Sequence, residues 1–224
     1  MKHRSIALDG PSGAGKSTMA KRLAAELGFL YVDTGAIYRT LGLFALRQGV
    51  DPGDGEAVEP LLGKATIRMA YAEDGLQHMY LDEEDVTRAI RTPEVSSAAS
   101  KISAIPAVRA FLLDMQRDMA RENDVVMDGR DIGTVVLPQA DVKIFLVASV
   151  EARARRRYAE LLERGVETDL AQVLVEIQER DQRDSGRAAA PLRQAEEAYL
   201  VDTTEYSLED SFQSLLHLVR EKLG

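Results

Sequence analysis

A glycine-rich segment near the N-terminus carries the residue types with the clearest chemical use. Residues 10–17 (GPSGAGKS) match the pattern G-x-x-x-x-G-K-[ST] at every fixed position. Glycines let backbone N–H groups converge on a phosphate, and a helix that starts there adds partial positive charge. Lys16 can reach the β- and γ-phosphates of a nucleotide, and the Ser17 hydroxyl can bind Mg²⁺. The predicted nucleoside triphosphate site comprises Gly10, Pro11, Ser12, Gly13, Ala14, Gly15, Lys16, Ser17 and Thr18.

Three later blocks bring charged side chains to positions where ligands gather. Residues 33–39 (DTGAIYR) and 128–131 (DGRD) each follow a predicted strand, and residues 179–192 (ERDQRDSGRAAAPL) are rich in arginine. Ligands of open α/β sheets bind beyond the carboxyl ends of the strands. Arginine offers a rigid fork of donors that suits phosphate and carboxylate groups. The charged residues of these blocks are therefore candidate ligand contacts.

Hydrophobic spacing predicts the elements that hold these residues. A strand at 4–9, a helix at 16–27 and a strand at 29–32 are typical of a βαβ unit in a parallel sheet. Further strands are expected at 124–127, 142–147 and 198–201. Further helices are expected at 34–48, 56–62, 94–102, 107–121, 150–164, 170–183 and 207–223.

One segment departs from this alternation of strands and helices. Residues 64–72 and 76–81 predict paired strands, because the Asp-Gly step within Glu73-Asp74-Gly75 is a strong hairpin signal. We interpret this hairpin as part of a small insertion into the α/β fold. After it, Thr92 and Pro93 predict a helix start, since threonine caps helices and proline fits their first turn.

Composition excludes several classes of protein. The chain has 224 residues, with 45% hydrophobic and 29% charged, as in ordinary globular domains. It contains no cysteine, which excludes disulfides and thiol catalysis, and its net charge of −9 argues against a protein that coats nucleic acid. Only five residues separate Arg4 from the glycine-rich loop, and no apolar run approaches about 18 residues. A cytoplasmic location without membrane contact is therefore expected.

Five blocks together resemble the bacterial cytidylate kinases of the nucleoside monophosphate kinase family. They are GPSGAGKST, DTGAIYR, IRTPEVSSAASKIS, DGRDIGTVV and ERDQRDSGRAAAPL, and their order covers essentially the whole chain. The resemblance implies an α/β P-loop kinase fold, with a central parallel sheet flanked by helices, a small antiparallel-sheet insertion and a helical lid. It implies a core in residues 1–33, 106–149 and 168–224, a monophosphate-binding segment in 34–105 and a lid in 150–167.

The resemblance also implies the reaction. The γ-phosphoryl group of ATP passes to CMP or dCMP, with Mg²⁺, and gives CDP or dCDP for pyrimidine nucleotide metabolism. ATP and CMP or dCMP are then the expected partners, with no membrane and no nucleic acid polymer. Nothing in the sequence demands more than a monomer.

Five positions match the family's contacts with the acceptor phosphate. The guanidinium groups of Arg39, Arg130 and Arg187 are expected to bind that phosphate, because Arg–phosphate pairs are often bidentate. Arg180 is expected close to the transfer site, and Thr34 is expected to touch the phosphate through its hydroxyl. Phosphoryl transfer asks for positioning and charge neutralisation. Arg130 and Arg180, together with the loop lysine, are therefore the expected catalytic groups.

Four positions match the family's contacts with the nucleoside. Asp184 resembles the residue that accepts hydrogen bonds from the ribose hydroxyls. Ser100, Arg109 and Asp131 match the positions that read cytosine: a carboxylate can accept from the exocyclic amine, and Ser and Arg can donate to the ring carbonyl and N3. Uracil would leave these groups mismatched, which is costly in a buried site.

Three charged features have alternative interpretations. The run at residues 153–157 (RARRR) is either a solvated helix face or a set of cations that closes over ATP, with Arg157 expected to reach its phosphates. Asp128 either orients Mg²⁺ through bound water or caps the following turn. For Arg130, the alternative to phosphate binding is an internal ion pair with Asp128 or Asp131.

Two other functions compete with this interpretation. A P-loop kinase of another acceptor, such as UMP, AMP or dTMP, is disfavoured by the cytosine-reading set and by the insertion hairpin. A nucleotide-dependent switch of the GTPase type usually carries an Asn-Lys-x-Asp motif, and this sequence contains none. Turnover with a panel of acceptor substrates would distinguish a CMP kinase from a kinase of another acceptor. Hydrolysis without any acceptor would favour the nucleotide-dependent switch.

Overall fold

The computed structural model describes residues 3–72, 75–163 and 165–224. Glu73 and Asp74 of the predicted turn, and Arg164 at the end of a predicted helix, lie outside the described residues. The chain forms two compact units: unit 1 comprises Met1–Leu30 and Asn123–Gly224, and unit 2 comprises Tyr31–Glu122. In the described part of the chain, no helix combines the length and apolar composition that crossing a membrane requires.

A five-stranded sheet forms the framework of unit 1, with the order β2-β6-β1-β7-β8. Its strands are β1 (Ser5–Asp9), β2 (Leu30–Asp33), β6 (Val125–Gly129), β7 (Val142–Val147) and β8 (Tyr199–Asp202), and the chain passes into unit 2 within β2. β1 pairs in parallel with β6 and β7, and β7 pairs in parallel with β8. The central strands are buried, as expected for a parallel sheet covered by helices. The predicted α/β fold is confirmed.

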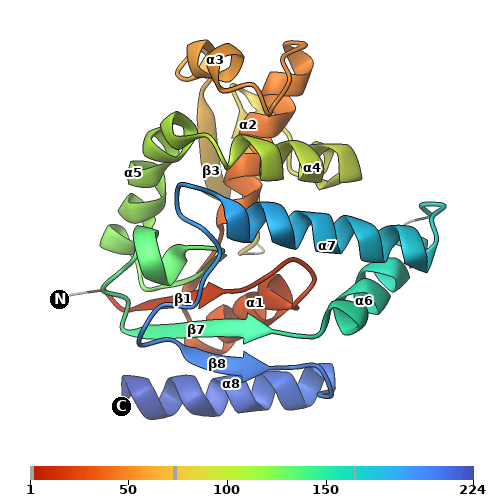
Figure 1. Ribbon diagram of the computed structural model, residues 1–224. Helices are drawn as coiled ribbons and strands as arrows, with labels where there is room; N and C mark the ends of the chain where they lie inside the picture. The colour runs from red at the N-terminus through yellow and green to blue at the C-terminus, as the bar shows by residue number, and fades with distance from the viewer. Residues whose placement is uncertain (1–2, 73–74, 164) are drawn as a thin grey trace. The chain divides into compact units, whose positions relative to one another are not determined.

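Long helices accompany this sheet in unit 1 (Figure 1). They are α1 (Lys16–Leu27), α6 (Val150–Glu163), α7 (Leu170–Gly186) and α8 (Leu208–Leu223). α1 packs on α8, where the Arg22 guanidinium lies 3.8 Å from the centre of the Phe212 ring and pairs with Glu209. α6 and α7 share an apolar cluster that includes Leu161 and Ile177.

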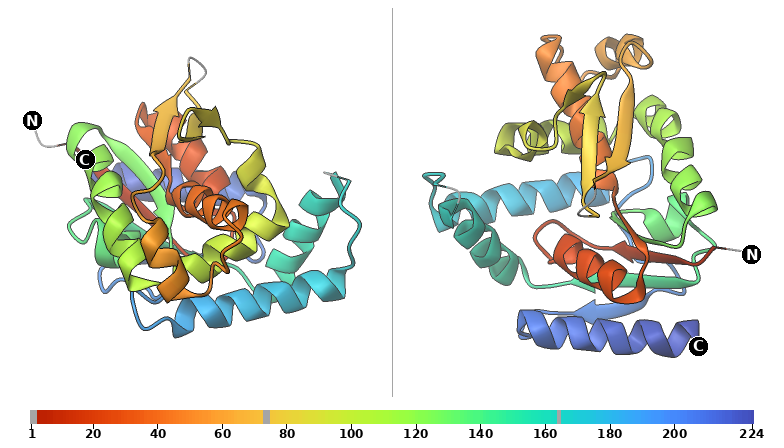
Figure 2. Two further views of the ribbon diagram at one scale, coloured as in Figure 1. Left: turned by 90° about the horizontal axis from the view of Figure 1, so that it is seen from above. Right: turned by 180° about the vertical axis from the view of Figure 1, so that it is seen from behind.

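Unit 2 consists of helices and a small antiparallel sheet. Its helices are α2 (Thr34–Arg47), α3 (Gly55–Val58), α4 (Pro93–Ile102) and α5 (Pro106–Glu122), with short 3₁₀ turns η1 (Glu59–Leu61) and η2 (Ala89–Arg91). The sheet contains β3 (Ile67–Tyr71), β4 (Gln77–Leu81) and β5 (Glu84–Asp85), visible from behind in the right panel of Figure 2. The predicted hairpin is therefore confirmed, and a short third strand accompanies it.

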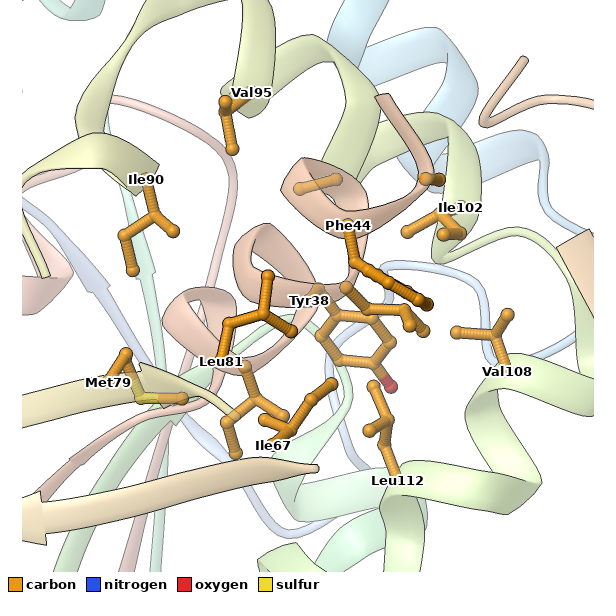
Figure 3. Packing of buried hydrophobic residues seen from close by; sticks show 14 of the residues in the cluster. Tyr38, Phe44, Ile67, Met79, Leu81, Ile90, Val95, Ile102, Val108 and Leu112 are labelled. Carbon is orange, nitrogen blue, oxygen red and sulfur yellow. The ribbon is translucent and has the colours of Figure 1, made fainter. Parts of the chain in front are cut away.

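An apolar core packs the helices of unit 2 against its small sheet (Figure 3). Tyr38 and Phe44 of α2 meet side chains of the small sheet, of α4 and of α5, such as Ile67 and Leu112. α2 and α4 approach closely at Gly42, where a Cβ would lie 3.1 Å from the backbone nitrogen of Ala99. This packing fixes the start of α2, which carries two of the predicted substrate contacts.

Two local features differ from the sequence prediction. The helix predicted at 56–62 divides into α3 and η1, because Pro60 has no N–H to continue the helical bonds. The segment after β6 forms a π-helical turn, η3 (Ile132–Val136), in which the Leu137 N–H donates to the Ile132 carbonyl over 2.7 Å. Such turns are rare and occur frequently at functional sites. Thr92 caps α4 as predicted, since its hydroxyl accepts from the Val95 N–H.

Candidate active site

The phosphate loop connects β1 to α1 with its lysine already oriented. Lys16 is buried, and its ammonium group donates to the carbonyl of Pro11 over 2.7 Å. Burial lowers the pKa of Lys16 well below its ordinary value, and the charges of Arg130 and Arg180 lower it further, against the opposing effect of Asp128. Negative charge placed among these cations would raise the pKa again. The loop is therefore electrostatically suited to a polyphosphate.

Gly10 is a position that only glycine can occupy in this loop. Its φ is +149°, and a Cβ there would lie 2.0 Å from the carbonyl oxygen of Leu146 in β7. We expect Gly10→Ala to lower the free energy of unfolding by about 3 kcal/mol, through backbone strain and displacement of β7. Gly28→Ala is the matched control: its φ is +68° but a Cβ would meet nothing within 4 Å, so about 1 kcal/mol is expected. Equal losses in chemical denaturation would contradict the steric explanation.

Ser17 and Asp128 meet at the opening of the same loop. The Ser17 hydroxyl donates to the Asp128 carboxylate over 2.7 Å, which brings α1 and the end of β6 together. Hydroxyl and carboxylate oxygens are the hard ligands that Mg²⁺ prefers, and Mg²⁺ commonly takes only one or two protein groups beside phosphate oxygens and water. No cluster of three or more His, Asp or Glu side chains occurs among the described residues. The donor set therefore fits a magnesium ion held jointly with a nucleotide.

Three arginines surround one buried carboxylate near the end of α7. Asp184 is 3% exposed, and one of its oxygens accepts from Nε of Arg130 over 3.0 Å. Burial would raise the pKa of Asp184, but the charges of Arg130, Arg180 and Arg187 outweigh it and hold the pKa below its ordinary value. Arg130 thus forms an ion pair with Asp184. The charges of three arginines therefore act on this one buried carboxylate.

The arginine-rich run of α6 has divided roles. Arg153 is 3% exposed, donates to the carbonyl of Ser12 and pairs with Asp181 over 2.6 Å. It therefore connects the phosphate loop to α7. The interpretation of the run as a solvated helix face is therefore wrong for Arg153. Arg157 pairs with Glu160 and is partly exposed. Its approach to ATP stays a prediction.

In unit 2, the Asp33 carboxylate at the start of α2 pairs with two arginines. Asp33 caps the helix by accepting from the Ala36 N–H, and it also accepts from Arg39 over 2.7 Å and from Arg91 over 3.0 Å. Burial would raise the pKa of Asp33, but the two guanidinium charges lower it overall. A Cβ on Gly35 would lie 3.0 Å from Nη1 of Arg39, so this position needs a small residue. Arg39 is therefore an oriented cation and not a free surface side chain.

The small sheet supports this turn directly. The side-chain amide of Gln77 accepts from the Asp33 N–H and donates to the Asp33 carbonyl, and the Tyr71 hydroxyl donates to the Tyr31 carbonyl over 2.8 Å. The insertion thus fixes the backbone from which Thr34 and Arg39 project. Thr34 is buried at the first position of α2.

The predicted base-reading residues of unit 2 lie near one another. The Arg109 guanidinium lies 5.5 Å from the centre of the Tyr38 ring and donates to the Ser103 carbonyl. The Ser100 carbonyl in turn accepts from the Ser103 hydroxyl, and Ser100 is buried. The third predicted reader, Asp131, belongs to unit 1 and is buried before η3.

Several residues that shape these sites were missed by sequence reasoning. Asp33 and Arg91 stand inside two of the five quoted blocks, so their position there was a usable signal. Asp9 ends β1, and its carboxylate contacts a segment more than a hundred residues away. Arg153 stands in an arginine run whose sequence gives no sign of its contacts with Ser12 and Asp181. Only the packed structure reveals these two roles.

Comparison with known proteins decides the family. The family model for cytidylate kinase matches residues 6–221. The chain belongs to the cytidylate kinase family. A cytidylate kinase from an Exiguobacterium species is 50% identical over 216 residues, which are 96% of each chain. A cytidylate kinase from Caldicellulosiruptor bescii is 49% identical and covers 97% of this chain and 96% of its own.

The membership confirms the resemblance, the P-loop kinase fold and the class of enzyme, an ATP-dependent nucleoside monophosphate kinase. A solved structure of an uncharacterised protein from Eubacterium ventriosum has a similar fold, with a TM-score of 0.55, 10% identity and coverage of 97% of this chain and 99% of its own. That likeness concerns the fold alone.

Proposed function

We propose that this cytidylate kinase family member transfers the γ-phosphoryl group of ATP to CMP or dCMP and forms CDP or dCDP. The observation that carries the proposal is the pair of built cation sites: Lys16 with the Asp184 arginine cluster in unit 1, and Arg39 held by Asp33 in unit 2. Lys16 and Arg180 suit ATP and the transferred group, and Arg39, Arg130 and Arg187 suit the acceptor phosphate. The family and its relatives, named cytidylate kinases, support CMP as the acceptor.

The proposed mechanism relies on positioning and on charge neutralisation. The CMP phosphate is itself the nucleophile, so no strong base is required near neutral pH. Lys16 and Arg180 neutralise the transferred phosphoryl group, and Arg39, Arg130 and Arg187 hold the acceptor phosphate beside it. The buried carboxylates Asp33 and Asp184 keep the guanidinium groups oriented before substrate arrives. Little reorganisation is then needed when the phosphates meet.

Magnesium is part of the proposal. Ser17 would hold it, with Asp128 acting through a bound water, and the ion would supply neutralisation of the β- and γ-phosphate oxygens. The Ser17–Asp128 hydrogen bond keeps the two oxygen groups adjacent in the free protein. Water and nucleotide oxygens would supply the remaining ligands of the ion.

Selectivity for cytosine is proposed to come from Ser100, Arg109 and Asp131. Arg109 already uses its guanidinium on a carbonyl and a ring, which restricts its orientation. Asp184 is proposed to accept from ribose hydroxyls. We further propose that residues 150–167 act as a lid with Arg157, and that residues 34–105 bind the monophosphate. We also propose that the protein is a monomer, that it works in the cytoplasm, and that it binds neither membranes nor nucleic acid polymers.

The deciding experiment measures ADP formation from Mg-ATP with CMP, dCMP, UMP, AMP, dTMP and no acceptor at equal concentrations. We expect turnover with CMP and dCMP to exceed turnover with UMP by about a hundredfold, because uracil mismatches the buried polar groups. Equal turnover with UMP would remove the selectivity assigned to Arg109 and Asp131. The absence of any acceptor-dependent turnover would overturn the proposed reaction and leave a nucleotide-binding protein.

A further inference from the structure

Asp9 is a buried carboxylate outside the proposed catalytic and substrate-binding residues. It is the last residue of β1 and is 4% exposed. One of its oxygens accepts from the Ile132 N–H over 2.8 Å, and the other accepts from the Gly133 N–H over 2.7 Å. Both oxygens of the carboxylate therefore hold the first turn of η3.

These two bonds close a short loop that contains Arg130 and Asp131. In the β1–β6 ladder, Asp9 is the register partner of Gly129, the last residue of β6. The chain then leaves the sheet, and the N–H groups of the third and fourth residues after Gly129 donate to the side chain of Asp9. A few residues anchored at both ends to one position retain little backbone freedom. The two proposed substrate contacts are thus fixed from both sides by a single residue.

The turn itself needs such support. η3 is a π-helical turn, which is rare in proteins because its geometry is less favourable than that of an α-helix. Gly133 approaches its surroundings closely, since a Cβ would lie 3.4 Å from an Asp9 oxygen and 3.3 Å from the Lys143 side chain. The carboxylate supplies two acceptors at the point where the turn begins.

We propose that Asp9 is a positioning residue of the kinase: its carboxylate holds the turn that places Arg130 at the acceptor phosphate and Asp131 at the base. The inference rests on the proposed roles of these two residues. Asp9 touches no substrate itself, and it acts through the backbone of Ile132 and Gly133.

The charge state of Asp9 is consistent with this role. Burial raises the pKa of Asp9 to about 6, and the charge of Asp131 adds to the rise, while the two N–H donors and Lys16 oppose it. Lys143 of β7 borders the same turn but pairs with Glu197. Near neutral pH the group is ionised and both oxygens can accept. In acid, one oxygen carries a proton that would face a backbone N–H.

Asp9→Asn is the direct test, because its amide offers one acceptor and places a donor against the second N–H. We expect kcat/KM for CMP to fall by about a hundredfold, while the Kd of ATP stays within about threefold of wild type. Amide hydrogen exchange at Ile132 and Gly133, measured without substrate, should accelerate at least about tenfold. Thr134→Val is the matched control: the buried Thr134 hydroxyl has no hydrogen-bond partner among the described residues, so both readouts should stay near wild type.

Three outcomes would overturn the proposal: unchanged kcat/KM, unchanged exchange at both amides, or equal losses of ATP and CMP binding, which would make Asp9 a general structural residue. The exchange measurement needs no turnover, so it still tests Asp9 if the proposed reaction fails in the wild-type protein.

If Asp9→Asn does not fold, the test is a pH titration of amide resonances in the wild-type protein. Those of Ile132 and Gly133 should titrate together near pH 6, and resonances that do not move between about pH 4.5 and 7.5 would contradict the contact.

Discussion

Lys16→Ala is expected to lower kcat by about three orders of magnitude, with a much smaller effect on the KM of CMP. Lys16 is the buried cation of the phosphate loop, and its ammonium group is oriented by the Pro11 carbonyl. Because negative charge develops on the phosphoryl group as it transfers, the lysine stabilises the transition state more than the bound acceptor. Steady-state kinetics with ATP and CMP varied independently measure both effects.

The fold of this variant should be at least as stable as that of the wild type. The pKa of Lys16 is lowered in the folded protein, which means that the fold disfavours the charged form, so removing it relieves a cost at neutral pH. Thermal unfolding checks this point. Lys21→Ala is the matched control, because Lys21 lies exposed on the same helix, and its turnover should stay within about twofold of wild type. Turnover like that of the wild type in Lys16→Ala would remove the assigned role.

Asp184→Ala is expected to harm CMP and dCMP unequally. Asp184 is proposed to accept from ribose hydroxyls, and only CMP offers a 2′-OH. We expect kcat/KM to fall by about a hundredfold for CMP and about tenfold for dCMP, with the general loss reflecting disorder of Arg130. The measurement is the ratio of kcat/KM for the two substrates in each variant. Equal losses would make Asp184 a 3′-OH contact or a structural counterion.

The same change should destabilise the protein. Asp184 is the buried anion among Arg130, Arg180 and Arg187, and its lowered pKa shows that the ionised form is favoured in the fold. Removing one partner of a buried ion pair leaves an uncompensated charge, so a loss of about 3 kcal/mol is expected in denaturant unfolding. Asp184→Asn keeps an acceptor without the charge. It should therefore lose stability while retaining more of the preference between CMP and dCMP than Asp184→Ala.

Local pattern predicted most elements of the fold. The bounds of α1 and β7 agree with those expected from hydrophobic spacing, because each has a clear period and a clear boundary. β5 was missed because its two residues, Glu84 and Asp85, are exposed and acidic and carry no strand pattern. η3 was missed because a π-helical turn has no period of its own and depends on contacts made elsewhere in the chain.

The candidate site likewise contains residues that the sequence could predict and residues whose contacts it could not. The phosphate loop could be predicted because its chemistry lies in consecutive residues, and the substrate contacts because they stand in motif blocks. Arg153 differs because its partners Ser12 and Asp181 are distant in sequence. Asp33 likewise forms ion pairs with both Arg39 and Arg91, and no spacing rule connects these three residues. Residue types predict what a side chain can do, and packing decides which neighbours it has.

The burial of Asp9 also shapes how the stability of the protein depends on pH. Its pKa rises from 3.8 to about 6 on folding, so between these values the folded protein binds more protons than the unfolded chain. The contribution of Asp9 to the free energy of unfolding is therefore fully present below about pH 4 and is lost as the pH rises through 6, by about 3 kcal/mol in all. At neutral pH the ionised carboxylate weakens the fold that it organises. The proposed positioning role of Asp9 and the thermodynamic stability of the fold therefore place opposite requirements on this one group.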